Sequence, residues 1–223
     1  ASYVRDGAVM PYKRSHELSL ALEKAITDRG GDVWYNSEVV RFLYNEDGSC
    51  AGVELKSGEK IYAKEIISNV IPNNVYAMSD EKCVPEKELK LANSRKLGLS
   101  FVTVYLGMDC TKEELGINDY TTFISKYSNP RECFNHRDEG AYYVVNCHNV
   151  AIPDASPEGT CMLFFTMPML EEDFPKDLKP EEYKKWKNDF AKRYIEDAEK
   201  VLGLDITPHI EEIEVATPVT FAR

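Results

Sequence analysis

The sequence lacks the short motifs that mark most nucleotide-binding and hydrolytic sites. Its 223 residues contain no Gly-x-Gly-x-x-Gly loop, no Walker-type phosphate loop, no Gly-x-Ser-x-Gly and no His-Glu-x-x-His. The first of these loops seats a dinucleotide pyrophosphate at a helix N-terminus. The residues present therefore do not make a complete dinucleotide site by themselves.

Basic charge and long apolar runs are also scarce. Lys and Arg number 27 against 38 Asp and Glu, a net charge of -11, which excludes a general electrostatic attraction to nucleic acid. The longest apolar stretch, Cys161 to Leu170, is interrupted by Thr166 and Pro168 and is shorter than the ~20 residues of a membrane span. The first residues lack the sections of a secretory signal, so we predict a cytosolic location.

Cysteine is present without the density or the Cys-x-x-Cys pairs of a disulfide or zinc framework, which predicts reduced thiols. The six cysteines are Cys50, Cys83, Cys110, Cys133, Cys147 and Cys161. One closer grouping, Cys133, His136, Cys147 and His148, has the residue types of a zinc site. Because adjacent ligands such as Cys147 and His148 do not match the usual spacing, we expect no metal.

The first third of the chain has the pattern of a helix followed by a small antiparallel sheet. An amphipathic helix begins near Ser15 and ends at Gly30-Gly31, where glycine stops a helix. Strands are predicted, by β-prone runs between turn residues, at Val33 to Tyr35, Val39 to Tyr44, Ala51 to Leu55 and Lys60 to Ala63. The run Ile66 to Ser68 predicts a further short buried strand.

The remainder reads as a second sheet with helices around it. A charged helix is predicted over Asp80 to Lys96, and a long amphipathic helix between Pro180 and Gly203, with Tyr183, Trp186, Phe190, Tyr194, Ala198 and Val201 on one face. Further strands are predicted at Leu99 to Gly107, Thr122 to Tyr127, Ala141 to Val145, Cys161 to Met167 and His209 to Ala216. The fold class is α/β in the mixed α+β sense, with a mixed or antiparallel second sheet.

Several short motifs occur in a consistent order along the whole chain. They include Gly30-Gly31-Asp32-Val33, Glu38-Val39, Gly52-Val53, Ile66-Ile67-Ser68-Asn69, Tyr105-Leu106-Gly107-Met108-Asp109, Thr111-Lys112-Glu113-Glu114-Leu115, Pro157-Glu158-Gly159 and Ala216-Thr217-Pro218. In this order they resemble the middle of the phytoene desaturase family, which includes carotenoid isomerases and retinol saturases. No single motif decides the resemblance, but their succession does.

The resemblance implies an FAD-dependent oxidoreductase with a glutathione-reductase-like FAD-binding domain. Residues 1–75 would form part of that domain, residues 76–215 a substrate-binding domain, and residues 216–223 the start of the return to the FAD domain. Because the pyrophosphate loop precedes this region in relatives, we expect the chain to be an internal fragment that is inactive alone and does not retain FAD. The substrate would be an apolar, polyene or lipid-like small molecule, and peripheral membrane contact of the parent protein and its oligomeric state stay open.

Four residues are the cofactor candidates that the resemblance implies. Val39 would lie against the FAD adenine, mainly through its backbone, and Ile67, Ser68 and Asn69 would lie near the FAD. An ordinary strand valine and a strand-ending turn are the alternative interpretations. No catalytic residue is identified, and His16 is interpreted as a surface or capping residue.

Two further features concern the substrate. Relatives have Gly-Gly where this chain has Lys13-Arg14; the pair is either solvated or supplies a charge for an acidic substrate group or the flavin. The aromatic residues Tyr105, Phe123, Tyr127, Tyr142, Tyr143, Phe164 and Phe165 either line an apolar pocket or belong to the core. A non-catalytic binding module with the same fold, or a related flavin amine oxidase, is the alternative function.

Overall fold

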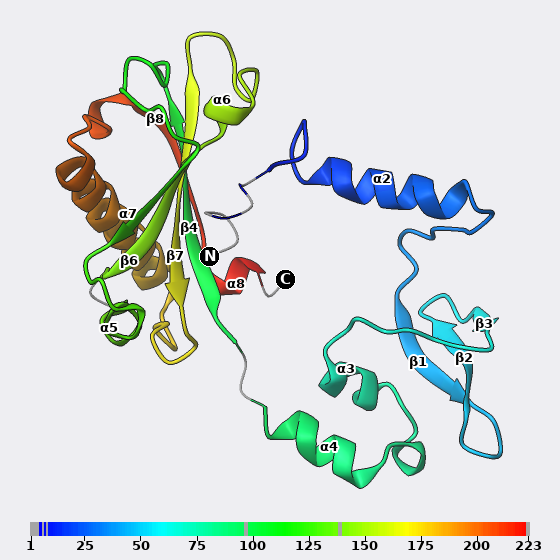
Figure 1. Cartoon of the computed structure of the whole chain (residues 1–223). Helices are drawn as coiled ribbons and strands as arrows, with labels where there is room; N and C mark the ends of the chain where they lie inside the picture. Colours follow the sequence, from blue (N-terminus) through cyan, green and yellow to red (C-terminus); the bar gives the residue numbers. More distant parts are fainter. Residues whose placement is uncertain (1–4, 6, 8, 96–97, 138–139, 222–223) are drawn as a thin grey trace. The chain divides into compact units, whose positions relative to one another are not determined.

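The computed structural model describes residues 5, 7, 9–95, 98–137 and 140–221 (Figure 1). The chain forms two compact units, one of Ala1–Ser19 with Gly98–Arg223 and the other of Leu20–Leu97. We call them the large unit and the small unit. Helix α2 (His16–Thr27) crosses the boundary between them. The assignment of residues 1–75 to an FAD-binding domain and of residues 76–215 to a substrate-binding domain stays a prediction.

The small unit contains the predicted meander. Strands β1 (Val39–Tyr44), β2 (Cys50–Leu55) and β3 (Lys60–Tyr62) pair antiparallel in that order. Gly52 is required in β2 because a Cβ atom there would lie 2.2 Å from the backbone oxygen of Ile61 on β3. The Gly52-Val53 motif therefore reflects the close approach of two strands.

Helices of the small unit surround this sheet only in part. Helix α2 ends before Gly30, whose φ of +79° suits glycine. None of its residues is buried by other described residues. Helix α3 (Pro72–Ala77), the 3-10 turn η1 (Glu81–Cys83) and helix α4 (Glu86–Asn93) follow. The helix predicted over Asp80 to Lys96 is thus shorter and broken, and its predicted end lies outside the described residues.

Two predicted strands of this unit are wrong. Val33 to Tyr35 and Ile66 to Ser68 form no strand, and the Ile67 side chain is 97% exposed. A β-prone run becomes a strand only where another strand satisfies its backbone groups. Neither run has such a partner among the described residues.

The large unit is built on a five-stranded antiparallel sheet, which confirms the antiparallel form of the predicted second sheet. Its strands are β4 (Ser100–Met108), β5 (Thr121–Ser125), β6 (Tyr142–Cys147), β7 (Cys161–Met169) and β8 (Ile210–Ala216), in the order β5-β6-β7-β4-β8. Strand β7 alternates between fully buried and half-buried residues along its whole length. That alternation shows that the two faces of the sheet differ.

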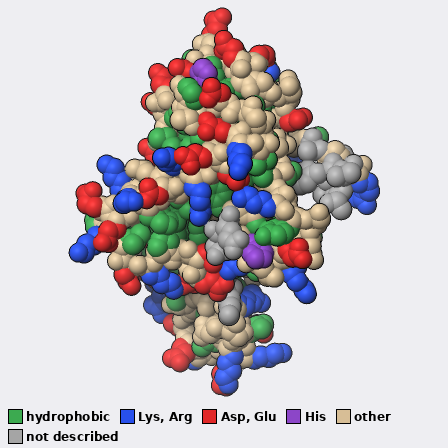
Figure 2. All heavy atoms as spheres, turned by 90° about the vertical axis from the view of Figure 1, so that its left-hand side faces the viewer, with side chains coloured by type: hydrophobic (Ala, Val, Ile, Leu, Met, Phe, Trp, Pro, Cys, Tyr) green, Lys and Arg blue, Asp and Glu red, His purple; other side chains and the backbone are tan. Residues whose placement is uncertain are grey.

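Helix α7 (Pro180–Leu202) covers one face of the sheet (Figure 1). The Glu182 carboxylate accepts a hydrogen bond from the Lys179 backbone N–H at its start, and Gly203 with a φ of +68° ends it. The core between helix and sheet includes Val104, Leu106, Tyr143, Phe165, Met167, Phe190, Tyr194 and Ala198. Val201, predicted for the buried face, is 52% exposed. Acidic and basic side chains occupy much of the surface on this side (Figure 2).

The large unit also contains short helices. Helices α5 (Pro130–Asn135) and α6 (His148–Ala151) lie between strands, the 3-10 turn η3 (Thr207–His209) precedes β8, and α8 (Pro218–Phe221) follows β8. Thr217, in the motif before α8, is fully buried, and its hydroxyl hydrogen-bonds the Tyr183 hydroxyl of α7 at 2.6 Å. Among the described residues, no helix combines the length and apolar character that a bilayer crossing requires.

Candidate functional site

A hollow of about 640 Å³ lies in the small unit between β1, β2, α3 and the segment before α3. Val39, Ile67, Ser68 and Asn69, the four predicted cofactor residues, are all among its lining. The structure thus brings together residues that come from two separate segments. Their roles in binding stay a prediction.

Local hydrogen bonds set the shape of this hollow. Val39 begins β1 opposite Leu55 of β2, and the Phe42 N–H donates to the Met78 carbonyl at 2.9 Å, which ties β1 to the end of α3. The Ser68 hydroxyl accepts a hydrogen bond from the Val70 N–H at 3.3 Å. These hydrogen bonds hold the two walls of the hollow, β1 and α3, in place. The Ile67 side chain, in contrast, is exposed to solvent.

The lining suits an uncharged ring better than a phosphate. It is mostly aliphatic, and it contains Glu38 as its charged residue, without Lys or Arg. The Glu38 carboxylate already pairs with Lys56 at 2.7 Å, and this hydrogen bond raises the pKa of Lys56. A pyrophosphate is usually bound by N–H donors and cations, and no Lys or Arg lines this hollow.

The large unit presents a second candidate surface, the face of the sheet opposite α7, which we call the open face. Of the predicted aromatic set, the open face carries Tyr105, Phe123, Tyr142 and Phe164. Tyr143 and Phe165 point to α7 and are fully buried. The core interpretation is thus confirmed for Tyr143 and Phe165, and the pocket interpretation of the other members stays a prediction, since neighbouring strand residues face opposite sides.

Ring contacts organise the open face. Tyr105 and Phe164 lie 6.1 Å apart by ring centroids, and Phe123 and Tyr142 lie 6.5 Å apart in a stacked arrangement. An apolar hollow of about 410 Å³ adjoins Tyr142 and is also lined by Leu99, Tyr127, Cys133 and Phe134. The face and hollow together offer an extended apolar surface to a ligand.

The aromatic prediction missed two members of the open face. Phe101 of β4 is 42% exposed on this face, and the His148 ring at the start of α6 lies 4.7 Å from the Phe164 ring. Phe101 lies four residues before Tyr105, and this even spacing along one strand is a signal that the two share a face. His148 follows the end of β6, so sequence alternation alone did not assign it to the face.

The Lys13-Arg14 pair has a backbone that fits the glycines of relatives. Lys13 has a φ of +61° and Arg14 a φ of +84°, values that glycine adopts most readily. The Arg14 guanidinium donates to the Ala155 carbonyl at 3.0 Å, in the large unit. The chain therefore keeps a glycine-type turn while carrying a cation to a site that Gly-Gly would leave without a side chain.

The grouping of Cys133, His136, Cys147 and His148, for which we expected no metal, is spread over several surroundings. Cys133 Sγ lies 3.0 Å from Ser125 Oγ and 3.2 Å from the Tyr127 carbonyl, and the His136 ring stacks on Tyr127. Cys147 is buried in the core under α7, whereas His148 lies on the open face. Cys133 and His136 thus share Tyr127 as a neighbour, whereas Cys147 and His148 lie on opposite faces of the sheet.

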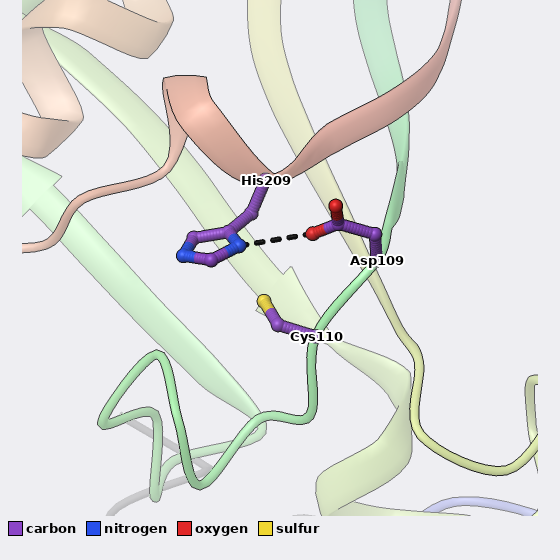
Figure 3. Close-up of side chains that lie close together, drawn as sticks. All are labelled: Asp109, Cys110 and His209. Carbon is purple, nitrogen blue, oxygen red and sulfur yellow. Dashed lines mark hydrogen bonds and ion pairs between the residues drawn. The ribbon is translucent and has the colours of Figure 1, made fainter.

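A different cluster gathers where β4 ends and β8 begins (Figure 3). Asp109, Cys110 and His209 place their donor atoms within 4.8 Å of one another, and His209 Nδ1 lies 2.9 Å from Asp109 Oδ1. Burial and the Asp109 charge raise the pKa of the Cys110 thiol, which opposes the thiolate that metals require. The Asp109 N–H also donates to the His209 carbonyl at 3.0 Å. The contacts explain the cluster as a clamp between two strands.

Comparison with known proteins gives relatives of low identity, and no family model matches the chain. It is 25% identical over 208 residues to "Prolycopene isomerase, chloroplastic" of Arabidopsis thaliana, which covers 92% of the chain and 34% of the relative. It is 26% identical over 244 residues to "All-trans-retinol 13,14-reductase" of Danio rerio, covering 98% and 40%. The chain spans about a third of the length of these relatives.

Two further matches concern a short segment and the fold. "Phytoene desaturase (neurosporene-forming)" of Rhodobacter capsulatus is 36% identical over 56 residues, 25% of the chain and 11% of the relative. A solved oxidoreductase from Methanosarcina mazei superposes with a TM-score of 0.61 at 15% identity, over 92% of the chain and 42% of that protein. It shares the fold. The sequence relatives, at low identity, fit the phytoene desaturase, carotenoid isomerase and retinol saturase-like family that the motifs of this chain resemble.

Proposed function

We propose that these residues form part of an FAD-dependent oxidoreductase that acts on carbon–carbon bonds of an apolar, polyene-like substrate. The observation that carries the proposal is the meeting of Val39, Ile67, Ser68 and Asn69 around one hollow whose lining is mostly aliphatic and contains no Lys or Arg. The names of the relatives, a prolycopene isomerase, a retinol reductase and a phytoene desaturase, support the substrate class.

In this proposal the two ligands use different surfaces of the chain. The hollow of the small unit receives the adenine, which packs on Val39, and the open face of the large unit receives the apolar substrate. The bound flavin supplies hydride transfer. The chain's own residues bind and orient: the aromatic side chains hold the substrate and keep water from it. No acid or base is assigned among them.

The chain by itself should not retain FAD. Its hollow offers no cation for the pyrophosphate, and its sequence contains no Gly-x-Gly-x-x-Gly loop. We expect FAD to separate from the chain on gel filtration and the protein peak to lack flavin absorbance. A yellow complex with one FAD per chain would contradict this expectation.

Weak adenine binding is the direct test of the hollow. Adenosine titrated into the labelled chain should shift the amide NMR signals of Val39, Ile67, Ser68 and Asn69, and flavin mononucleotide, which lacks adenine, should not. Val39→Arg should abolish these shifts because it places a long cation in the hollow. Val40→Arg is the matched control, because Val40 is the next residue and does not line the hollow. Equal effects of the two variants would refute the site.

A non-catalytic binding protein is the second candidate, and one relative favours it. The chain is 28% identical over 134 residues, 56% of its length, to "Inactive all-trans-retinol 13,14-reductase" of Danio rerio. The two functions differ in one measurement, since a polyene extracted after incubation with a binding protein is chemically unchanged, whereas an enzyme converts it to a product. The assay uses the natural full-length protein with FAD and a polyene. The cytosolic location and the peripheral membrane contact stay predictions.

A further inference from the structure

A row of rings crosses the open face and includes a histidine. Tyr105 of β4 lies 6.1 Å from Phe164 of β7, Phe164 lies 4.7 Å from His148, and His148 lies 5.8 Å from Tyr120, by ring centroids. We call these four residues the aromatic row. Phe164 in the row is apolar and His148 is polar, and we call the part of the row at His148 and Tyr120 its polar end.

The polar end contains an atom that the described part of the chain leaves without a partner. His148 Nδ1 is buried, and no described residue makes a hydrogen bond to it. Buried polar atoms are normally paired, because leaving one unpaired costs free energy. A ligand atom that hydrogen-bonds Nδ1 would therefore be stabilised there.

Arg14 supplies a positive charge at the same end. Its guanidinium donates to the Ala155 carbonyl at 3.0 Å, in the loop that follows α6. A guanidinium has five N–H donors, so this bond leaves capacity for another acceptor. Burial lowers the pKa of His148, and the Arg14 charge lowers it further, which agrees with a neutral imidazole beside a cation.

The surroundings make this charge distinctive. The chain carries a net charge of -11, yet no described carboxylate lies within ion-pair distance of Arg14. Arg14 has a φ of +84°, a conformation that is unfavourable for a residue with a side chain. The side chain is thus brought here against a backbone preference.

We propose that Arg14 and His148 bind the carboxylate of an apolar substrate whose chain lies along the aromatic row. Arginine binds carboxylates through two parallel hydrogen bonds, and a carboxylate oxygen at Nδ1 selects the imidazole tautomer with its proton on that atom. The inference rests on the proposed function for the apolar substrate and adds its end group. It names a polyene or fatty carboxylic acid instead of a hydrocarbon.

The test compares ligands that share a chain and differ at one end. All-trans-retinoate, all-trans-retinol and retinyl phosphate are titrated into the chain by calorimetry. Retinoate should bind about tenfold more tightly than the other two, as one charge-assisted contact pair provides. Equal affinity for retinol and retinoate would overturn the inference and leave the apolar substrate standing. Tight binding of retinyl phosphate would overturn the carboxylate specificity.

Variants test whether the Arg14 charge, and not a change in folding, determines retinoate affinity. Arg14→Gln should lower retinoate affinity about tenfold and leave retinol affinity unchanged, and His148→Phe should act in the same direction while keeping the ring. Lys13→Gln is the matched control, because Lys13 is the adjacent cation with the same type of backbone and should change nothing. Circular dichroism checks that each variant folds. If Phe164→Ala loses retinol binding and Arg14→Gln keeps it, the result supports both the apolar substrate and the separate carboxylate site. If the chain binds neither retinol nor retinoate, both the proposed substrate class and the carboxylate site are overturned.

Discussion

Phe164 and Phe165 are neighbours on β7 with opposite surroundings, so they provide a sharp test of the two-faced sheet. Phe165 is fully buried and lies between Val104 of β4 and Val145 of β6 under α7. Phe164 is half-buried on the open face. Phe165→Ala should therefore reduce the free energy of unfolding by about 3–5 kcal/mol, the usual range for a phenylalanine removed from a core.

Phe164→Ala should cost much less, about 1 kcal/mol, because part of its ring is already in water and no closed cavity remains. Its effect should instead be on ligands, with weaker binding of a polyene. The two substitutions remove the same atoms from the same strand. Their difference therefore measures burial alone.

The assay must report the large unit and not the small one. The chain has two tryptophans, Trp34 in the small unit and Trp186 in α7. Trp34 is 52% exposed, so Trp34→Phe gives a tolerated background in which Trp186 fluorescence follows urea unfolding of the large unit. Equal losses for Phe164→Ala and Phe165→Ala in this background would refute the assignment of faces.

Two further predictions concern hydrogen bonds to carboxylates. Hydrogen bonds from Thr111 lower the pKa of Glu114, so this carboxylate stabilises the fold above its unfolded pKa and the gain is lost as pH falls through the folded value. Glu114→Gln should thus lower urea stability at about pH 7 and match the wild type more closely at about pH 3; an equal deficit at both pH values would contradict this. The Tyr143 hydroxyl donates to Asp197 at 2.8 Å, so Tyr143→Phe should cost about 1.5–3 kcal/mol in the same urea assay, and a similar loss from Tyr142→Phe on the open face would argue against it.

Much of the fold follows from local patterns in the sequence. Strand β7 was predicted from its β-prone run, and α7 from Pro180 at its start and Gly203 at its end. These elements form as predicted because propensity, turn residues and burial agree there. The same kind of apolar run failed at Ile66 to Ser68, where no described strand pairs with it.

The sequence by itself determined the types of most elements and the order of the motifs, whereas the four candidate cofactor residues come from the family resemblance and their roles stay predictions. Only the tertiary structure decided that Phe164 and Phe165 serve different faces, because that depends on where α7 packs. It also decided that Arg14 reaches Ala155, 141 positions further along the chain. Such contacts join distant segments through the packing of a whole unit, and no local periodicity encodes them.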